Sequence, residues 1–397
     1  MDLDINLFKI LLRLEEIEIE KVEMGTKSIH VYCKMSEVGH KECPKCKKLV
    51  SKNRSKYRRT IRDLNISGRQ VYLELQVHQY DCSCGRKFSE QFDFVSSGKS
   101  YTKRQAKYIF EMSAKQSHLQ VGSITDTCHK TVERICYEFV EKELKSINWS
   151  RIFRIGIDEF AFKKGHKDFI VTLINLDTGE IIEILEKRDK SFLRAYFKSL
   201  GVDFLNQVKE FCSDMWGPFQ DLAKELFPNA LIHVDRFHWT IHLNKALDSY
   251  RKHLRRKNKE EEIFKGLKWT LIKRQKNLNA RELEGLNKAL EKDKELKRIY
   301  DFRNEFQYIF DTHLSIEKAT DKVNIWLEKV LKFNSRYLLK FVQLFKRHRN
   351  HIMNYFKTRL SSAAVEGKNN LLRTVKRFTF NMSNFKNFRY RVFAYNL

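Results

Sequence analysis

The chain has 397 residues and carries 77 Lys and Arg against 50 Asp and Glu, a formal net charge of +27. Hydrophobic residues make up 42% of the sequence and aromatic residues 13%, which excludes an intrinsically disordered chain; the length predicts roughly two or three domains. No apolar run reaches the roughly 18 residues of a membrane span, and the N-terminus lacks the features of a signal peptide. We therefore expect a soluble, cytoplasmic protein with no membrane partner.

The excess of positive charge runs along the whole chain and is not confined to one tail. Such a potential attracts the phosphate backbone of nucleic acids, and its neutralisation releases condensed counterions. The alternative is a basic protein from a lysine-rich proteome that has no polyanionic partner. A charge of this size on one chain favours the nucleic-acid partner.

Four of the eight cysteines form two closely spaced pairs. Cys43 and Cys46 form a Cys-x-x-Cys pair, and Cys82 and Cys84 form a Cys-x-Cys pair. Each pair predicts a tight turn that aims two thiolates at one point, and together they supply the four soft ligands of one structural Zn²⁺ site. Because cytosolic thiols stay reduced, zinc is favoured over a disulfide. His40 could replace one thiol, although four cysteines suffice.

The segment before the second cysteine pair has the alternating pattern of a strand. Apolar residues at 71, 73, 75 and 77 alternate with polar or amphipathic ones and lead directly into Cys82. Arg69, Arg86 and Lys87 flank this strand. We therefore expect a zinc ribbon that presents these three cations to DNA.

Residues 101–146 carry apolar residues at helical spacing. A turn is predicted at 120–123, and Thr125 or Thr127 is the candidate N-cap of the helix that follows. This pattern indicates a helix–turn–helix, which binds the major groove of duplex DNA. A small helical bundle that only links two domains fits the same pattern, so both interpretations stay open.

After residue 151 the pattern changes to short strands that alternate with turns and helices. Strands are predicted at 153–157, 169–174, 181–185, 208–212 and 230–234, and helices around 191–200 and 219–226. Asp158, Asp214 and Asp235 come just past the ends of the first, fourth and fifth strands. Carboxylates gathered at one sheet edge suit Mg²⁺, and two such ions can drive phosphoryl transfer. The alternative is that they are solvated turn residues, since turns favour Asp.

Short motifs follow one another through the second half of the chain. They are GIDEFA at 156–161, KGH at 164–166, DM at 214–215, FPNA at 227–230, VDRFH at 234–238, VEGKNN at 365–370 and VKR at 375–377. In sequence and order these motifs resemble the transposases of the ISL-three insertion-sequence family, whose zinc ribbon also fits the paired cysteines. The resemblance covers nearly the whole chain. It implies an RNase H-like catalytic domain with an Asp-Asp-Glu (DDE) triad.

The resemblance also implies roles for individual residues. By motif, Asp158, Asp214 and Glu366 are the three acids that hold two catalytic Mg²⁺ ions, with Mn²⁺ able to replace Mg²⁺. Asp235 and His238 belong to a block that lies beside the site, where they would support the metal ligands or contact DNA.

Two competing assignments concern neighbours of these residues. Glu159 is the rival of Asp158 as first acid, but adjacent side chains of a strand point to opposite faces, so only one can face the metal ions. His238 and His242 have the spacing of a zinc-binding pair on a helix, but Trp239 stands where that motif needs Glu. Histidines of the core or of a DNA-facing surface are the better interpretation.

The region between Asp235 and Glu366 has no proline and shows helical spacing throughout. Asn279 and Glu282 predict a capping box. We interpret this region as an all-helical insertion in the catalytic domain. Beyond it, cations are interleaved with phenylalanines, a composition that suits contact with DNA ends. The candidate DNA-binding cations there are Lys368, Arg373, Lys376 and Arg377.

Together these observations predict an α+β multidomain protein. Its parts are a zinc-ribbon domain (1–100), a helical, helix–turn–helix-like segment (101–148), an RNase H-like mixed α/β core (149–250), an all-helical insertion (251–355) and a final Glu-bearing helix with a basic C-terminus (356–397). The resemblance implies a transposase that binds the terminal inverted repeats of its element, cuts there and joins the 3′-hydroxyl to target DNA. It would act on double-stranded DNA as a homodimer or higher oligomer, associated with the nucleoid when bound. A catalytically silent DNA-binding regulator and a nuclease that cuts without joining remain as alternatives.

Overall fold

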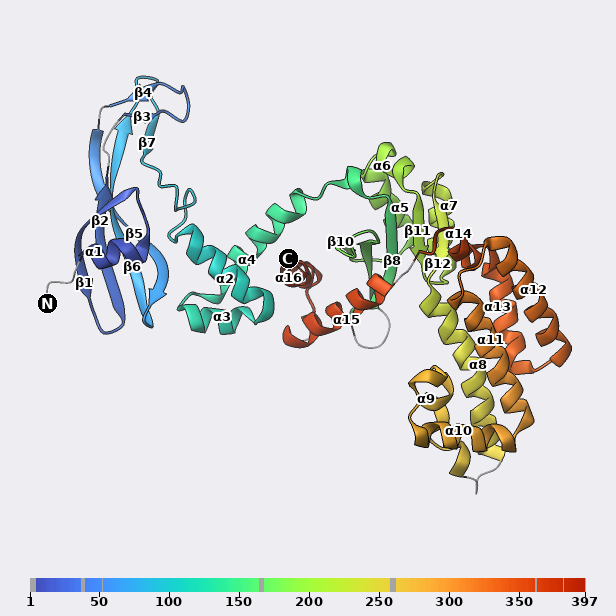
Figure 1. Cartoon of the computed structure of the whole chain (residues 1–397). Coiled ribbons are helices and arrows are strands. Elements are labelled where there is room, and N and C mark those ends of the chain that lie inside the picture. Colours follow the sequence, from blue (N-terminus) through green and yellow to red (C-terminus); the bar gives the residue numbers. More distant parts are fainter. Residues whose placement is uncertain are drawn as a thin grey trace. The chain divides into compact units, whose positions relative to one another are not determined.

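The computed structural model describes residues 5–36, 40–51, 53–163, 168–257, 262–360, 363–380 and 382–396 (Figure 1). The chain forms two compact units. The first contains Met1–Ser146 and Val375–Leu397, and the second contains Ile147–Thr374. Among the described residues, no helix is long and apolar enough to cross a membrane.

The first unit begins with helix α1 (Ile5–Leu12) and a sheet in the order β1-β2-β6-β5, with β7 paired to β6. The strands are β1 (Ile17–Met24), β2 (Ser28–Met35), β5 (Asn53–Ile66), β6 (Arg69–Asp81) and β7 (Lys87–Ser89). The apolar residues of β6 are fully buried while the residues between them are half-buried, which confirms the predicted strand. Ser67 and Gly68 both have positive φ, as a two-residue hairpin loop between β5 and β6 requires.

Helices complete this unit. They are α2 (Lys103–Lys115), α3 (His118–Thr125), α4 (His129–Lys145) and, from the far end of the chain, α16 (Phe385–Asn396). Helix α16 packs against α2 and α4. The buried guanidinium of Arg391 donates a hydrogen bond to the carbonyl of Gln116, and the rings of Tyr390 and Tyr137 stack at 4.3 Å. The C-terminal helix is therefore part of the N-terminal helical cluster.

The prediction of a turn at 120–123 is wrong, because these residues lie inside α3. The turn comes later, where Asp126 adopts a left-handed conformation, and the N-cap of α4 is Cys128, not Thr125 or Thr127. Gly122 has a different reason to be glycine. A Cβ at this position would lie 2.7 Å from the carbonyl oxygen of Thr127, so the close approach of the backbone excludes a side chain.

The second unit contains a five-stranded mixed sheet in the order β10-β9-β8-β11-β12. The strands are β8 (Arg154–Ala161), β9 (Phe169–Asn175), β10 (Ile181–Leu185), β11 (Glu210–Ser213) and β12 (Leu231–Val234). Strand β9 pairs antiparallel with both β8 and β10, whereas β11 is parallel to both β8 and β12. The helices among them are η1 (Trp149–Arg151), α5 (Lys190–Ser199), α6 (Val202–Gln207) and α7 (Gly217–Leu226). All five predicted strands are present.

One detail of that prediction is wrong, since Asp158 lies within β8 and not past its end. The cause is unequal pairing on the two sides of the strand. Neighbouring β11 pairs with β8 only as far as Gly156, whereas β9 continues the ladder to Ala161. Asp158 therefore pairs with β9 on one side of β8, while on the other side the pairing with β11 has already ended.

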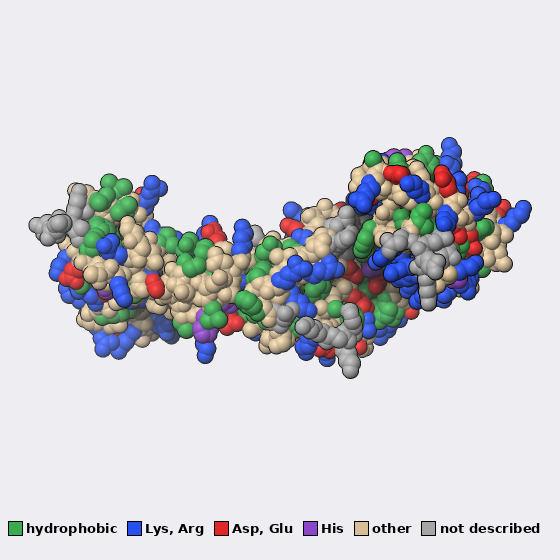
Figure 2. Space-filling view, turned by 90° about the horizontal axis from the view of Figure 1, so that it is seen from below, with side chains coloured by type: hydrophobic (Ala, Val, Ile, Leu, Met, Phe, Trp, Pro, Cys, Tyr) green, Lys and Arg blue, Asp and Glu red, His purple; other side chains and the backbone are tan. Residues whose placement is uncertain are grey.

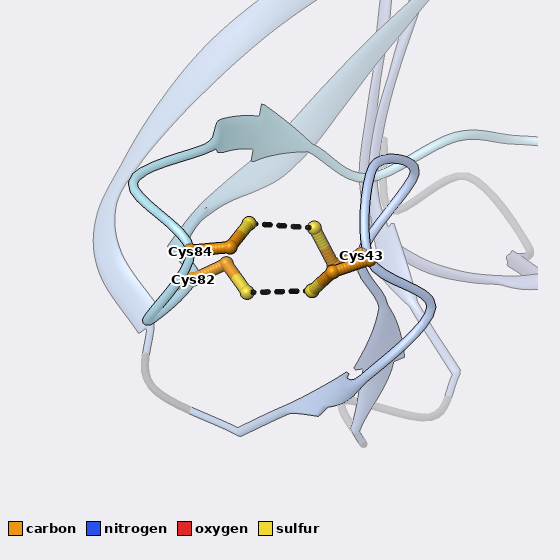
Figure 3. A group of neighbouring side chains, drawn as sticks. Cys43, Cys82 and Cys84 are labelled. Carbon is orange, nitrogen blue, oxygen red and sulfur yellow. Dashed lines mark hydrogen bonds between the residues drawn. The ribbon is translucent and has the colours of Figure 1, made fainter.

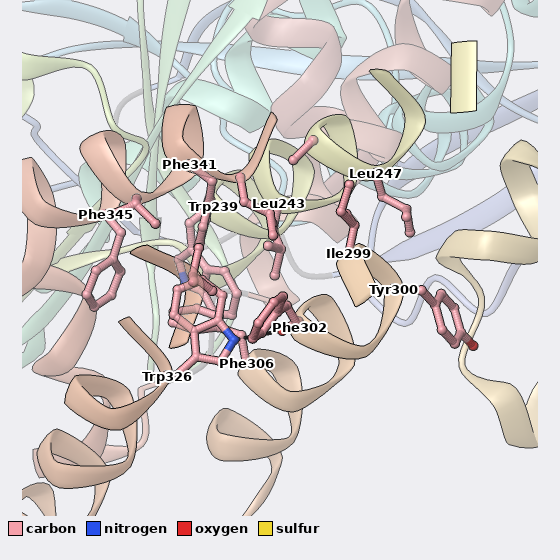
Figure 4. Packing of buried hydrophobic residues seen from close by; sticks show 14 of the residues in the cluster. Trp239, Leu243, Leu247, Ile299, Tyr300, Phe302, Phe306, Trp326, Phe341 and Phe345 are labelled. Carbon is pink, nitrogen blue, oxygen red and sulfur yellow. Dashed lines mark hydrogen bonds between the residues drawn. The ribbon is translucent and has the colours of Figure 1, made fainter. Parts of the chain in front are cut away.

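The rest of the second unit is helical. Its elements are α8 (Arg236–Lys257), η2 (Glu262–Phe264), α9 (Leu267–Ile272), η3 (Gln275–Asn277), α10 (Ala280–Lys292), α11 (Lys294–Asp311), α12 (Ile316–Phe333), α13 (Arg336–Met353), α14 (Tyr355–Thr358) and α15 (Ala363–Phe378). Trp239, Phe306 and Trp326 are central to its core, which Figure 4 shows. The predicted capping box of Asn279 and Glu282 is confirmed at the start of α10.

Candidate zinc centre and active site

The four paired cysteines converge at one point of the first unit (Figure 3). Their Sγ atoms all lie within 4.8 Å of one another, with 3.7 Å between Cys43 and Cys84 and 3.5 Å between Cys46 and Cys82. A tetrahedral zinc site with Zn–S bonds of about 2.3 Å has S···S edges of about 3.8 Å. The geometry therefore fits Zn²⁺, whereas His40 is exposed and not part of this group.

Both cysteine turns are built the same way despite their different spacing. Cys43 lies between β3 (Lys41–Glu42) and β4 (Leu49–Val50), and Cys82 lies between β6 and β7. A residue with positive φ closes each turn: Lys47 donates its N–H to the carbonyl of Cys43, and Gly85 donates to that of Cys82, both at 2.9 Å. Backbone N–H groups, first that of Cys46, lower the pKa of the Cys43 thiol to about 6. This favours the thiolate that zinc binds.

Three aspartates lie in or directly after adjacent strands of the second unit. Asp158 is in β8, while Asp214 and Asp235 directly follow β11 and β12, the next two strands of the sheet. Asp158 and Asp235 are buried and Asp214 is half-buried. Each accepts a backbone N–H, from Glu159 at 2.8 Å, Trp216 at 2.9 Å and Phe237 at 2.8 Å, respectively. The carboxylates are therefore held in fixed orientations.

Two of these aspartates, Asp158 and Asp214, have a raised pKa. Burial is the main cause that raises the pKa of Asp158, and the charge of Asp214 adds to it. Burial likewise raises the pKa of Asp214, with a further contribution from Asp235. The ring of His238, in the first turn of α8, opposes both shifts. Carboxylates that repel one another in a low-dielectric site are stabilised by an added cation.

His238 lies between two of these acids. Its Nε2 atom is 3.9 Å from a carboxylate oxygen of Asp158 and 3.9 Å from one of Asp235. The structure thus brings together four of the predicted site residues. Among the described residues, His238 and His242 do not belong to any group of three or more ligand side chains with metal-site geometry, so the alternative zinc site at these histidines finds no support there.

Asn369 is a site residue that the sequence analysis missed. It lies in α15, and its side-chain amide donates a hydrogen bond to Oδ2 of Asp158. Its position in the VEGKNN motif, three residues after Glu366, was the available signal. Glu366 is itself in α15, but its side chain lies outside the described residues, as do Lys164, Gly165 and His166 of the KGH motif.

Glu159, the rival first acid, has a partner of its own. Its Oε2 accepts a hydrogen bond from Nη1 of Arg188 at 2.8 Å. Arg188 comes from the loop between β10 and α5, and sequence reasoning gave no sign of it.

The predicted DNA-binding cations fall in separate places. Arg86 and Lys87 are exposed next to Cys84, but Arg69 begins β6 at the end opposite to the cysteines. In α15, Arg373 and Arg377 are exposed, whereas Lys368 and Lys376 are half-buried and burial lowers their pKa. Lys and Arg side chains are spread over the face of the molecule seen in Figure 2.

Comparison with known proteins agrees with this geometry. Residues 155–392 match a family model of ISL3 transposases, described as "Transposase", and residues 41–84 match a zinc-finger of the transposases of IS204, IS1001, IS1096 and IS1165. The chain is 23% identical over 325 residues to the transposase of IS1001 from Bordetella parapertussis, which covers 80% of each chain. It is 20% identical over 395 residues to the transposase of IS1557 from Mycobacterium tuberculosis, covering 92% of this chain and 88% of that one. Since the first family model matches more than half of the chain, this protein belongs to the ISL3 (ISL-three) family of DDE transposases.

Proposed function

We propose that this transposase moves its own insertion sequence by two-metal DDE chemistry, with Asp158, Asp214 and Glu366 as the acids. The observation that carries the proposal is that three aspartates lie in or directly after three adjacent strands. Two of these aspartates are buried, and Asp158 accepts a hydrogen bond from Asn369. A protein that only binds DNA has no use for such a cluster, because burying carboxylates together costs free energy.

The carboxylate oxygens of these acids are donors of the type that suits Mg²⁺. Mg²⁺ prefers carboxylate oxygens and tolerates sites that it completes with water and phosphate. Burial, with a smaller contribution from a neighbouring carboxylate in each case, raises the pKa of Asp158 and of Asp214, and a bound cation would oppose both effects. When bound, the ions would activate a water or a 3′-hydroxyl and stabilise the leaving oxygen of the phosphodiester. Mn²⁺, with similar oxygen preference, would substitute.

The chain's own residues prepare this site. Backbone N–H groups and Asn369 orient the carboxylates of Asp158 and Asp214 before any ion binds. Asp235, at the end of β12, and His238, in α8, would support these carboxylates. Glu366 would be supplied by α15, one helical turn before Asn369. We infer that the acid comes late in sequence because the all-helical region 251–355 is an insertion in the catalytic domain.

The sheet order supports an RNase H-like core. Three antiparallel strands continue into two parallel ones, with the first acid on the central strand β8. For DNA binding, we assign the zinc ribbon and the α2–α4 cluster, whose α3 and α4 meet in a tight turn as in a helix–turn–helix. The predicted domain limits at residues 100, 148, 250 and 355 belong to this proposal.

In this scheme the protein binds the terminal inverted repeats, hydrolyses a phosphodiester at each element end and joins the freed 3′-hydroxyls to target DNA. Both ends must be processed together, so the active form would be at least a dimer. No covalent protein–DNA intermediate is required, because water and then the 3′-hydroxyl are the nucleophiles.

The test uses labelled DNA with the element's own ends, supercoiled plasmid and Mg²⁺. We expect the wild type to form 3′-hydroxyl ends and join them to the plasmid, and Asp158→Asn to do neither while it still binds the ends. Asp221→Asn, an exposed acid on α7, is the matched control and should react normally.

The other outcomes identify the alternatives. Binding by the wild type without any cleavage would support the silent regulator, and cleavage without joining would support the nuclease. Full nicking by Asp158→Asn would remove this residue from the triad.

A further inference from the structure

Arg188 is a cation that contacts residues close in sequence to the first two proposed acids. Its guanidinium lies 4.2 Å from the ring centroid of Phe169 and 5.3 Å from that of Trp216. Its Nη1 donates to Glu159, the residue next to Asp158. Two aromatic rings and a carboxylate therefore fix the plane of this guanidinium.

The partners of Arg188 belong to the segments that carry the first two acids. Glu159 follows Asp158 in β8, and the backbone N–H of Trp216 is hydrogen-bonded to the carboxylate of Asp214 at 2.9 Å. Arg188 is thus held by the same two segments that carry these acids, although it comes from a different loop.

Arg188 keeps capacity for a further ligand. A guanidinium has five N–H donors. Among the described residues, Arg188 uses its Nη1 group to donate to Glu159. The side chain is 39% exposed, whereas its partner Glu159 is 14% exposed. A side chain that served only to neutralise Glu159 would not need to be this exposed. Arginine in this arrangement suits a phosphate, which accepts two parallel N–H bonds.

We propose that Arg188 binds a non-bridging oxygen of the DNA backbone at the bond to be cut. This inference rests on the proposed function, since it assigns a contact within the same active site. The Asp and Glu side chains around the reaction centre repel the substrate phosphate, and a fixed guanidinium offsets part of that repulsion as charge develops. Lysine would not replace it, because an ammonium lacks the planar fork.

The test measures single-turnover cleavage of end-containing DNA in Mg²⁺ by the full-length protein. Arg188→Gln and Arg188→Lys should slow cleavage by roughly 10- to 100-fold while end binding and the thermal unfolding midpoint stay close to wild type. Arg194→Gln is the matched control, because Arg194 is 36% exposed, is ion-paired with Glu225 and lies in α5. It should cleave normally.

Two further arms separate phosphate binding from a structural role. If Arg188 only neutralises Glu159, the double variant Glu159→Gln/Arg188→Gln would recover wild-type cleavage, which would overturn the inference. We expect no recovery. In the second arm, single neutral methylphosphonates replace the phosphates around the cut. One position should slow the wild type and leave Arg188→Gln unaffected; sensitivity of Arg188→Gln equal to that of the wild type at every position would also overturn the inference.

The controls distinguish this inference from the function on which it rests. Cleavage by the wild type and by Arg188→Gln at equal rates, with none by Asp158→Asn, would reject Arg188 alone. An absence of cleavage by the wild type would reject the proposed function and this inference with it.

Discussion

Asn369 offers the sharpest prediction about how the active site is held. Its amide donates to the Oδ2 of Asp158, whose other oxygen accepts the backbone N–H of Glu159 at 2.8 Å. Asn369→Ala removes the first bond and leaves one oxygen of a buried carboxylate without that donor. Hydrogen bonds to charged groups are worth about 1.5–3 kcal/mol, and about 1.4 kcal/mol is a factor of ten in rate, so cleavage should slow by roughly 10- to 150-fold.

The assay is single-turnover cleavage of end-containing DNA over a range of Mg²⁺ concentrations. If Asn369 orients Asp158 for the ions, Asn369→Ala should also need more Mg²⁺ for half-maximal rate, whereas a residue that only stabilises the fold would leave that midpoint unchanged. Asn370→Ala is the matched control, since Asn370 is the next residue of α15, is exposed and bonds to Arg373. A wild-type rate and Mg²⁺ midpoint for Asn369→Ala would refute this reasoning.

Four other substitutions test the fold, the zinc centre and a buried histidine. Gly122→Ala should lower the free energy of unfolding by about 1–3 kcal/mol, because its Cβ would meet the carbonyl oxygen of Thr127. Gly285 is in α10, and a Cβ added there would have no neighbouring atom within 4 Å, so Gly285→Ala should raise the free energy of unfolding by about 0.5–1 kcal/mol. Both values come from urea unfolding, and a change of the same sign for the two variants would contradict this account of how the glycines pack. Cys82→Ser should abolish binding of one zinc per chain, measured by metal analysis, and weaken end binding in a mobility-shift assay; full end binding without zinc would show that the ribbon does not recognise DNA. Burial lowers the pKa of His118 from 6.5 to about 3, so between these values the unfolded chain binds a proton that the folded chain does not, and stability should rise with pH. His118→Asn should flatten that rise in unfolding midpoints measured across the interval, and an unchanged slope would contradict it.

Patterns that depend on neighbouring residues could be predicted from the sequence. The strand β6 follows from alternation of residue types, and the zinc centre follows from two short cysteine spacings. Gly122 shows where this fails. Glycine in a polar stretch predicts a turn, but here the residue is helical and the need for glycine comes from the backbone of Thr127 across the next turn.

The proposed active site shows the same division. Asp214 and Asp235 were found because they follow strands, and the family motif then separated them from ordinary turn residues. The extent of β8 could not be foreseen, because it depends on β9 being a longer partner than β11. Arg188 had no signal at all. It is one of 77 basic residues, and only the tertiary structure places it against Glu159 and two aromatic rings.

The chain combines a net charge of +27 with a local cluster of acids, and the two features imply separate sources of binding and catalysis. Two carboxylates about 4 Å apart repel each other by about 4 kcal/mol at the effective dielectric constant of a protein surface, and a phosphate brought beside them would be repelled similarly. The acids therefore contribute nothing to holding DNA until divalent cations are present. Under the proposed function, attraction to DNA would come from cations elsewhere, and the exposed Arg86, Lys87 and Arg373 are the candidates. End binding in the absence of Mg²⁺ should for this reason fall steeply with salt, yet be no weaker in Asp158→Asn than in the wild type.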